Sequence, residues 1–163
     1  MSARATNSLV GALALALVIA AVVLGEALNL AACALCVLQR LIHLTLATQA
    51  VLAWPFGHWA ARPTSLLMAG TAAGGAWAAG YQVWLQRMAA GISCTGEQPW
   101  WEVVVNRAGA LWPRIFEANG FCNDLGWTFL GLSLADWSLL AFLAMTLLLL
   151  RAAFTPTKPR LRA

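Results

Sequence analysis

The sequence predicts an all-α integral membrane protein built as a bundle of four transmembrane helices. Of the 163 residues, 61% are hydrophobic and only 10% are charged, whereas about 25% are charged in ordinary soluble domains. Long apolar segments also recur four times along the chain, each close to the roughly 20 residues that a helix needs to cross a bilayer. We therefore expect one membrane domain whose main solvent is the lipid bilayer.

The first two spans are predicted at about residues 9–28 and 35–54. Asn7 or Ser8 can cap the first helix. The first span could instead be a signal peptide that ends in a lipoprotein-like box at Cys33. Glu26 interrupts that pattern, and a longer apolar segment begins at the cysteine. The second span is the most polar of the four, so its polar face should look into the bundle.

The third and fourth spans are predicted at about 64–85 and 134–150. The third follows a turn at 55–63 and carries small residues at a spacing of four, which lets helices approach closely; they are Gly70, Gly74 and Ala78, with Gly75 and Ala79 beside them. The loop at 86–133 is hydrophilic. Segments of it that carry bulky apolar side chains are expected to form a short helix at the membrane interface. A capping box at Ser133–Asp136 opens the fourth span.

The distribution of charge orients these spans. Four spans place both termini and the turn at 55–63 on one side, where six basic residues and no acidic residue give a charge of +6. The opposite side carries −2, and the two together give the +4 of the chain. Because cytoplasmic loops carry the excess of lysine and arginine, we expect both termini, and a disordered tail at 151–163, to be cytoplasmic. The loop at 86–133 then lies outside the cytoplasm; if the cell is bacterial, this side is the periplasm.

A Cys-x-x-Cys motif at the start of the second span is the main candidate for chemistry. Cys33, Cys36, Arg40 and His43 are spaced 3, 4 and 3 apart, so they share one face of a helix. A charge such as that of Arg40 costs about 2.5–3.5 kcal/mol inside the bilayer, so its presence needs a reason. Reactive sulfur is such a reason, because a cation and a helix N-terminus both favour thiolate over thiol. The alternative is an inert cysteine pair, with an arginine that snorkels to the headgroups and a buried core histidine.

The two remaining cysteines, Cys94 and Cys122, lie in the loop at 86–133. Four cysteines on the oxidising side of the membrane favour two disulfides, with three possible connectivities, of which 33–36 with 94–122 is the simplest. Closing the loop between Cys94 and Cys122 would contribute roughly 3–4 kcal/mol, and the short Cys33–Cys36 ring only about 2. The short pair is therefore better suited to being reduced and oxidised again than to stabilising the fold.

Together, these residues resemble the bacterial inner-membrane disulfide bond formation protein B (DsbB) family, over essentially the whole chain. The matching motifs appear in the order of the family: Cys33-x-x-Cys36-x-x-x-Arg40, Cys94, Trp112-Pro113-x-Ile-Phe116, Gly120-Phe-Cys122, and Phe129-Leu-Gly-Leu132 before Trp137. The resemblance implies an enzyme that re-oxidises a periplasmic DsbA-like dithiol oxidase and passes the electrons to the membrane quinone pool. Either ubiquinone or menaquinone is expected, with no metal and no nucleic acid.

The resemblance also implies a role for each cysteine. By position, Cys94 would form the mixed disulfide with the DsbA-like protein. Cys122 would be the cysteine with which Cys94 forms a disulfide inside this chain. Cys33 would take the electrons from this loop pair, and Cys36 would face the quinone ring as a thiolate.

The quinone would also be held by basic side chains. Arg40 would hold a quinone oxygen and stabilise the Cys36 thiolate, with His43 and Arg87 as further candidates for quinone binding. Some relatives carry histidine where this chain has Arg87, and a guanidinium cannot relay protons as an imidazole can.

Three other functions remain open from the sequence. The four cysteines could form a structural zinc site, although Cys94 and Cys122 lack the second close spacing that such sites have. The chain could also be a non-enzymatic membrane subunit whose outer loop is held by a disulfide. A quinone-linked enzyme of the vitamin K epoxide reductase type also uses a Cys-x-x-Cys pair, but at a different place in the chain order.

Overall fold

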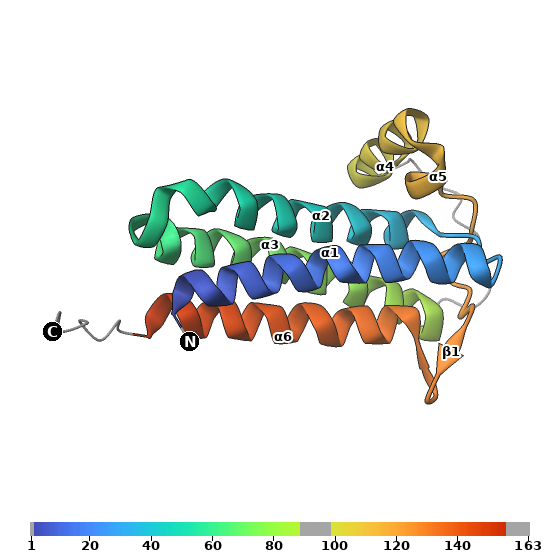
Figure 1. The fold of residues 1–163 in the computed structure, drawn as a ribbon. Coiled ribbons are helices and arrows are strands. Elements are labelled where there is room, and N and C mark those ends of the chain that lie inside the picture. The colour runs from blue at the N-terminus through green and yellow to red at the C-terminus, as the bar shows by residue number, and fades with distance from the viewer. Residues whose placement is uncertain (1, 89–98, 156–163) are drawn as a thin grey trace, which may run out of the picture.

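The computed structural model describes residues 2–88 and 99–155. Four long helices lie side by side in it: α1 (Ala3–Ala27), α2 (Ala34–Ala53), α3 (Gly57–Met88) and α6 (Leu134–Phe154). Helix α1 begins and helix α6 ends at the same end of this bundle (Figure 1). The short elements within residues 100–133 gather at the opposite end, which we call the outer end.

Three helices in residues 2–88 and 99–155 are long and apolar enough to cross a membrane: Ala3–Ala27, Ala34–Phe56, in which a 3-10 turn extends α2, and Leu134–Phe154. Large apolar side chains also cover their outward surfaces, among them Ile19 and Val23 of α1 and Leu147 of α6. Such extensive apolar exposure suits contact with lipid rather than with water. Helix α3 is longer, at 32 residues, but it contains several glycines and two glutamines and is not one of these three helices. The fourth crossing remains a prediction.

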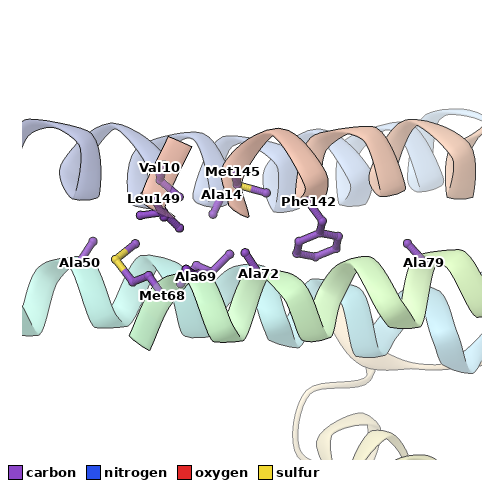
Figure 2. Close-up of a cluster of buried hydrophobic side chains, with 11 residues drawn as sticks. Val10, Ala14, Ala50, Met68, Ala69, Ala72, Ala79, Phe142, Met145 and Leu149 are labelled. Carbon is purple, nitrogen blue, oxygen red and sulfur yellow. The ribbon is translucent and has the colours of Figure 1, made fainter. Parts of the chain in front are cut away.

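Helices α3 and α6 pack through small residues on α3. Phe142 of α6 is fully buried and points toward α3 (Figure 2). A Cβ atom at Gly75 would overlap the Phe142 ring, whereas a Cβ atom at Gly70 or Gly74 would meet nothing within 4 Å. The contact therefore uses the row through Gly75 and Ala79, not the neighbouring row through Gly70 and Gly74. Both rows have a spacing of four, so spacing alone does not identify the packed face.

The rest of this core is apolar and joins all four long helices. It comprises Val10 and Ala14 of α1, Leu46 and Ala50 of α2, Met68, Ala69, Ala72 and Ala79 of α3, and Phe142, Met145 and Leu149 of α6.

The first helix starts earlier than its apolar run. The Ser2 side chain caps α1 by accepting a hydrogen bond from the Ala5 N–H (3.3 Å), so the predicted capping by Asn7 or Ser8 is wrong. Asn7 is buried instead; it donates to the Ala61 carbonyl (2.9 Å) and accepts from the Ser65 hydroxyl (2.7 Å). This exchange satisfies buried polar groups and fastens α1 to α3.

The turn after α2 is shorter than the sequence predicts. A 3-10 turn, η1 (Trp54–Phe56), is followed by Gly57 with a φ of +63°, and α3 begins there. Glycine adopts this conformation without a steric cost. Pro63 consequently lies inside α3, so the predicted turn at 55–63 is wrong for residues 57–63, which are helical. Helix α6 likewise continues to Phe154, and residues 156–163 of the predicted tail lie outside the described part of the chain.

The outer end carries two short helices, α4 (Trp100–Leu111) and α5 (Pro113–Phe116), and a hairpin of β1 (Thr128–Phe129) and β2 (Leu132–Ser133). Val105 of α4 and Phe116 of α5 pack on Val37 of α2. The hairpin leads into α6, whose start is held by the predicted capping box between Ser133 and Asp136. These elements bring residues from the loop at 86–133 over the start of α2.

We expect Gly75→Ala to destabilise the protein by about 1–3 kcal/mol, because the added methyl group overpacks the α3–α6 contact at Phe142. Gly74→Ala is the matched control; it adds the same atom to the same helix in open space and should be neutral or stabilising by about 0.5–1 kcal/mol. Thermal unfolding of the purified proteins in detergent measures both. Equal stability of the two variants would contradict the assigned packing face.

Candidate redox site

Cys33 and Cys36 meet at the N-terminus of α2. Cys33 is the N-cap residue, and its sulfur accepts a hydrogen bond from the Cys36 N–H (3.3 Å). The two sulfurs lie 3.0 Å apart, and both cysteines are free thiols. Because a helix N-terminus carries unpaired N–H groups and partial positive charge, it favours a negative charge at this point.

The loop that follows α5 brings a third sulfur to this point. The Asn119 and Gly120 N–H groups donate to the Ala32 carbonyl (3.0 and 2.9 Å), and Gly120 forms a parallel bridge with Cys33. A Cβ atom at position 120 would overlap the Ala31 carbonyl oxygen, so this docking requires glycine. As a result, the Cys122 sulfur is hydrogen-bonded to Cys33.

The environment favours a thiol at Cys33 and a thiolate at Cys122. Hydrogen bonds to the Cys122 and Cys36 sulfurs, together with burial, raise the pKa of Cys33 above its ordinary value. The hydrogen bond from Cys33 lowers the pKa of Cys122, against the effect of burial, and hydrogen bonds from the Leu35 and Ala34 backbone lower it further. Cys122 therefore has thiolate character beside the Cys33 thiol in this reduced site.

A cavity of about 250 Å³ lies on the inner side of the cysteines, between α1, α2 and α6. Its walls are mostly apolar, with Leu17, Val18, Ala21 and Leu24 from α1 and Leu134, Trp137 and Ala141 from α6. Polar groups line one part of it: Cys36, Gln39, Arg40 and His43 of α2, and Gln82 of α3. Such a combination of apolar walls and a few convergent polar groups is typical of a site for a small organic ligand.

Arg40 links the cavity to the outer loop. Its guanidinium donates to the Ile115 carbonyl of α5 (2.7 Å) and to the Ala21 carbonyl of α1 (3.5 Å). A guanidinium has five N–H donors, so these two bonds leave others for a ligand in the cavity that the side chain lines.

His43 also lines the cavity, as the helical spacing with Cys36 and Arg40 predicts. Its Nδ1 lies 2.8 Å from the Gln39 carbonyl oxygen, and its ring packs 4.1 Å from the Phe142 ring between centroids. Its Nε2 is buried and finds no hydrogen-bond partner among the residues that the structure describes.

The remaining predicted site residues lie elsewhere. Arg87 forms an ion pair with Asp136 (2.7 Å) at the outer end of α3 and is not among the residues that line the cavity. Its place in the structure favours a link between α3 and α6, and its role toward a quinone stays a prediction. Cys94 lies outside the described residues.

Gln82 was not identified by the sequence analysis. Its amide nitrogen lies 3.1 Å from the Cys36 sulfur and 3.4 Å from the Cys33 sulfur, and its amide oxygen accepts a hydrogen bond from Gln39 (2.8 Å). The available signal was a pair of glutamines in two apolar spans, because an amide within the membrane needs a partner.

Comparisons with known proteins match this chain to a family. The model of the family described as "Disulfide bond formation protein DsbB" matches residues 3–152. The chain is 36% identical to the disulfide bond formation protein B of Dechloromonas aromatica over 145 residues, which cover 85% of each chain. It is 30% identical to that of Paracidovorax citrulli over 160 residues, covering 96% of this chain and 90% of the relative. For Nitrosomonas europaea the identity is 38% over 122 residues, covering 71% and 72%.

We expect Gly120→Ala to separate Cys122 from Cys33, because the added methyl group collides with the Ala31 carbonyl. With Cys36 and Cys94 replaced by serine, a mild oxidant should form the Cys33–Cys122 disulfide at least roughly tenfold more slowly in this variant than in its parent. Leu125→Ala, at an exposed loop position, is the control and should leave the rate unchanged. Peptide mapping measures the disulfide, and equal rates in all three proteins would refute the docking.

Proposed function

Because the chain belongs to the disulfide bond formation protein B (DsbB) family and is thus a membrane protein of disulfide-bond formation, we propose that it is a thiol:quinone oxidoreductase. It takes electrons from a periplasmic DsbA-like dithiol oxidase and delivers them to a membrane quinone. One observation carries the proposal: Cys122, Cys33 and Cys36 are linked by hydrogen bonds in that order, and Cys36 lines an apolar cavity.

The first transfer takes place in the outer loop. A thiolate of the reduced partner attacks Cys94 of the Cys94–Cys122 disulfide, which forms a mixed disulfide and releases Cys122 as a thiolate. The second partner thiol then displaces Cys94, so the partner leaves oxidised and the loop pair is reduced. Cys94 is assigned this role from its position in the family motif, since it lies outside the described residues.

The second transfer moves the electrons to the bundle. The Cys122 thiolate attacks the Cys33 sulfur of the Cys33–Cys36 disulfide, the Cys33–Cys122 bond forms, and the electron pair of the broken bond stays on Cys36. The Cys94 thiolate then attacks Cys122, which restores the loop disulfide and releases Cys33. The contact of Cys33 with both other sulfurs supports this order, because thiol exchange requires attack on one sulfur while the other leaves.

The third transfer takes place at the cavity. Oxidation of the Cys33–Cys36 dithiol supplies two electrons and two protons, which is what reduction of a quinone to a hydroquinone consumes. The residues suit such a substrate: the walls are apolar, Cys36 reaches the cavity, and Arg40 has N–H groups to donate to a quinone carbonyl. His43 lines the same cavity and is assigned to quinone binding on that ground.

The proposed location is the bacterial inner membrane, with the redox cysteines on the periplasmic side. Among the described residues, Arg4, Arg62 and Arg151 lie where α1 begins and α6 ends, away from Cys33, Cys36 and Cys122, which supports a cytoplasmic position for that end. The periplasm is also the compartment in which disulfides persist.

The test is turnover of the full-length protein with a reduced DsbA-like dithiol and a soluble quinone, followed by the quinone absorbance. We expect catalytic turnover by the unmodified protein. Cys36→Ser should abolish quinone reduction but still oxidise one equivalent of partner through the loop disulfide. Repeated turnover by Cys36→Ser, or no turnover by the unmodified protein, would contradict the proposal.

Arg40→Met should weaken the use of quinone, mainly as a raised KM for quinone, because a positioned donor to the quinone oxygen is lost. Arg40→Lys should be partly tolerated, since an ammonium group replaces a planar fork with several donors. Formation of the Cys33–Cys122 disulfide serves as the control for structure, because Arg40 also holds the Ile115 carbonyl. Unchanged quinone kinetics in Arg40→Met would refute the assignment.

A further inference from the structure

Gln82 places a neutral amide against both sulfurs of the Cys-x-x-Cys pair. Its side chain is buried, with 3% exposure, on the face of α3 that meets α2. The amide group has two N–H bonds, and its nitrogen lies within hydrogen-bonding distance of the Cys36 sulfur (3.1 Å) and the Cys33 sulfur (3.4 Å). The shorter of the two contacts is to Cys36.

Gln39 determines which end of this amide faces the sulfurs. The Gln39 side-chain nitrogen donates to the Gln82 oxygen at 2.8 Å, and an amide nitrogen can only donate. With the Gln39 amide in this orientation, reversing the Gln82 amide would place two donors against each other and leave the Gln82 oxygen against the sulfurs. Because buried polar groups need partners, the Gln39 contact holds the N–H bonds of Gln82 toward Cys33 and Cys36.

We propose that Gln82 is a catalytic hydrogen-bond donor that stabilises the negative charge on the Cys36 sulfur when the Cys33–Cys36 bond breaks, and that Gln39 is its positioning residue. The inference rests on the proposed function, in the step where Cys122 attacks Cys33. In that step the Cys33–Cys122 bond forms, the electron pair of the Cys33–Cys36 bond remains on Cys36, and no proton moves. A fixed donor aimed at the atom where charge develops lowers the barrier of such a step.

Arg40 does not replace this donor in the structure. Its guanidinium is engaged with the Ile115 and Ala21 carbonyls and acts on Cys36 as a nearby charge, while Gln82 contacts the sulfur directly. An amide also keeps its hydrogens at every pH at which the protein is folded. The two residues thus have different roles. Arg40 can donate hydrogen bonds to a ligand in the cavity, and Gln82 donates to the Cys36 sulfur as it leaves.

A purely structural role for Gln82 can be separated from this catalytic one. Gln49 of α2 donates to the Thr71 hydroxyl of α3 (2.9 Å), so it also joins α2 to α3 by a side-chain amide. Gln49 does not line the cavity and contacts no cysteine sulfur in the described structure. Substitution of Gln49 therefore removes a comparable interhelical bond without touching the reacting atoms.

The experiment compares Gln82→Met with Gln49→Met in the full-length, reduced protein. Methionine retains the length of the side chain and removes the amide. The rate at which iodoacetamide alkylates Cys36 is measured against pH by peptide mapping, because the thiolate is the reactive form. Gln82→Met should move the midpoint for Cys36 upward and lower the alkylation rate at a fixed pH below it by about 10- to 100-fold. The turnover number should fall with little change in the KM for quinone.

Gln49→Met should leave the Cys36 midpoint unchanged. An unchanged midpoint in Gln82→Met, or an equal shift in both variants, would overturn the proposal. Should Gln82→Met fail to fold, Gln39→Met replaces it in the test. This variant retains the Gln82 amide and removes the group that orients it, so we expect a smaller upward shift of the Cys36 midpoint. No shift in Gln39→Met would refute the inference. Alkylation needs neither partner nor quinone. A shift at Gln82 in a protein that does not reduce quinone would therefore refute the proposed function alone.

Discussion

The site depends on one short backbone contact, in which the N–H groups of Asn119 and Gly120 bind the Ala32 carbonyl. Ala32 immediately precedes the N-cap of α2, where backbone groups are not yet used by the helix and can accept an outside partner. Gly120 lets its backbone segment approach the segment at Ala31 and Ala32 because it has no side chain. Through this contact a loop residue, Cys122, shares the N-terminus of α2 with Cys33, and the electrostatic field of that helix end acts on both sulfurs.

The outer half of the bundle gathers polar groups that would each be costly if isolated in the apolar interior. Gln82, Gln39 and His43 form a connected series. The Gln39 side chain donates a hydrogen bond to Gln82, and the Gln39 backbone carbonyl oxygen lies within hydrogen-bonding distance of the His43 ring. Together with Arg40 they make one polar wall of an otherwise apolar cavity. A lipid-soluble electron acceptor needs such an arrangement, because its ring partitions into apolar surroundings while its oxygens require hydrogen bonds.

The apolar core that adjoins these polar groups is built differently. Small residues of α3 let Phe142 of α6 pack directly on the helix backbone at Gly75, and the buried exchange between Asn7, Ala61 and Ser65 fastens α1 to α3. Close packing of this kind resists changes in volume. The packing at Gly75 joins α3 to α6, and the hydrogen bonds of Asn7 join α1 to α3.

The sequence alone determined the helical class, the positions of the apolar segments, the capping box at Ser133 and the common face of Cys33, Cys36, Arg40 and His43. These properties are local, because they follow from composition and from the 3.6-residue period of a helix. Only the tertiary structure decided that α3 packs through Gly75 rather than Gly74, that Gln82 faces the sulfurs, and that Arg87 pairs with Asp136. Each of these depends on the rotation of one helix against another. The contact of Cys122 with Cys33 depends in addition on the path of a long loop, which no spacing in the sequence encodes.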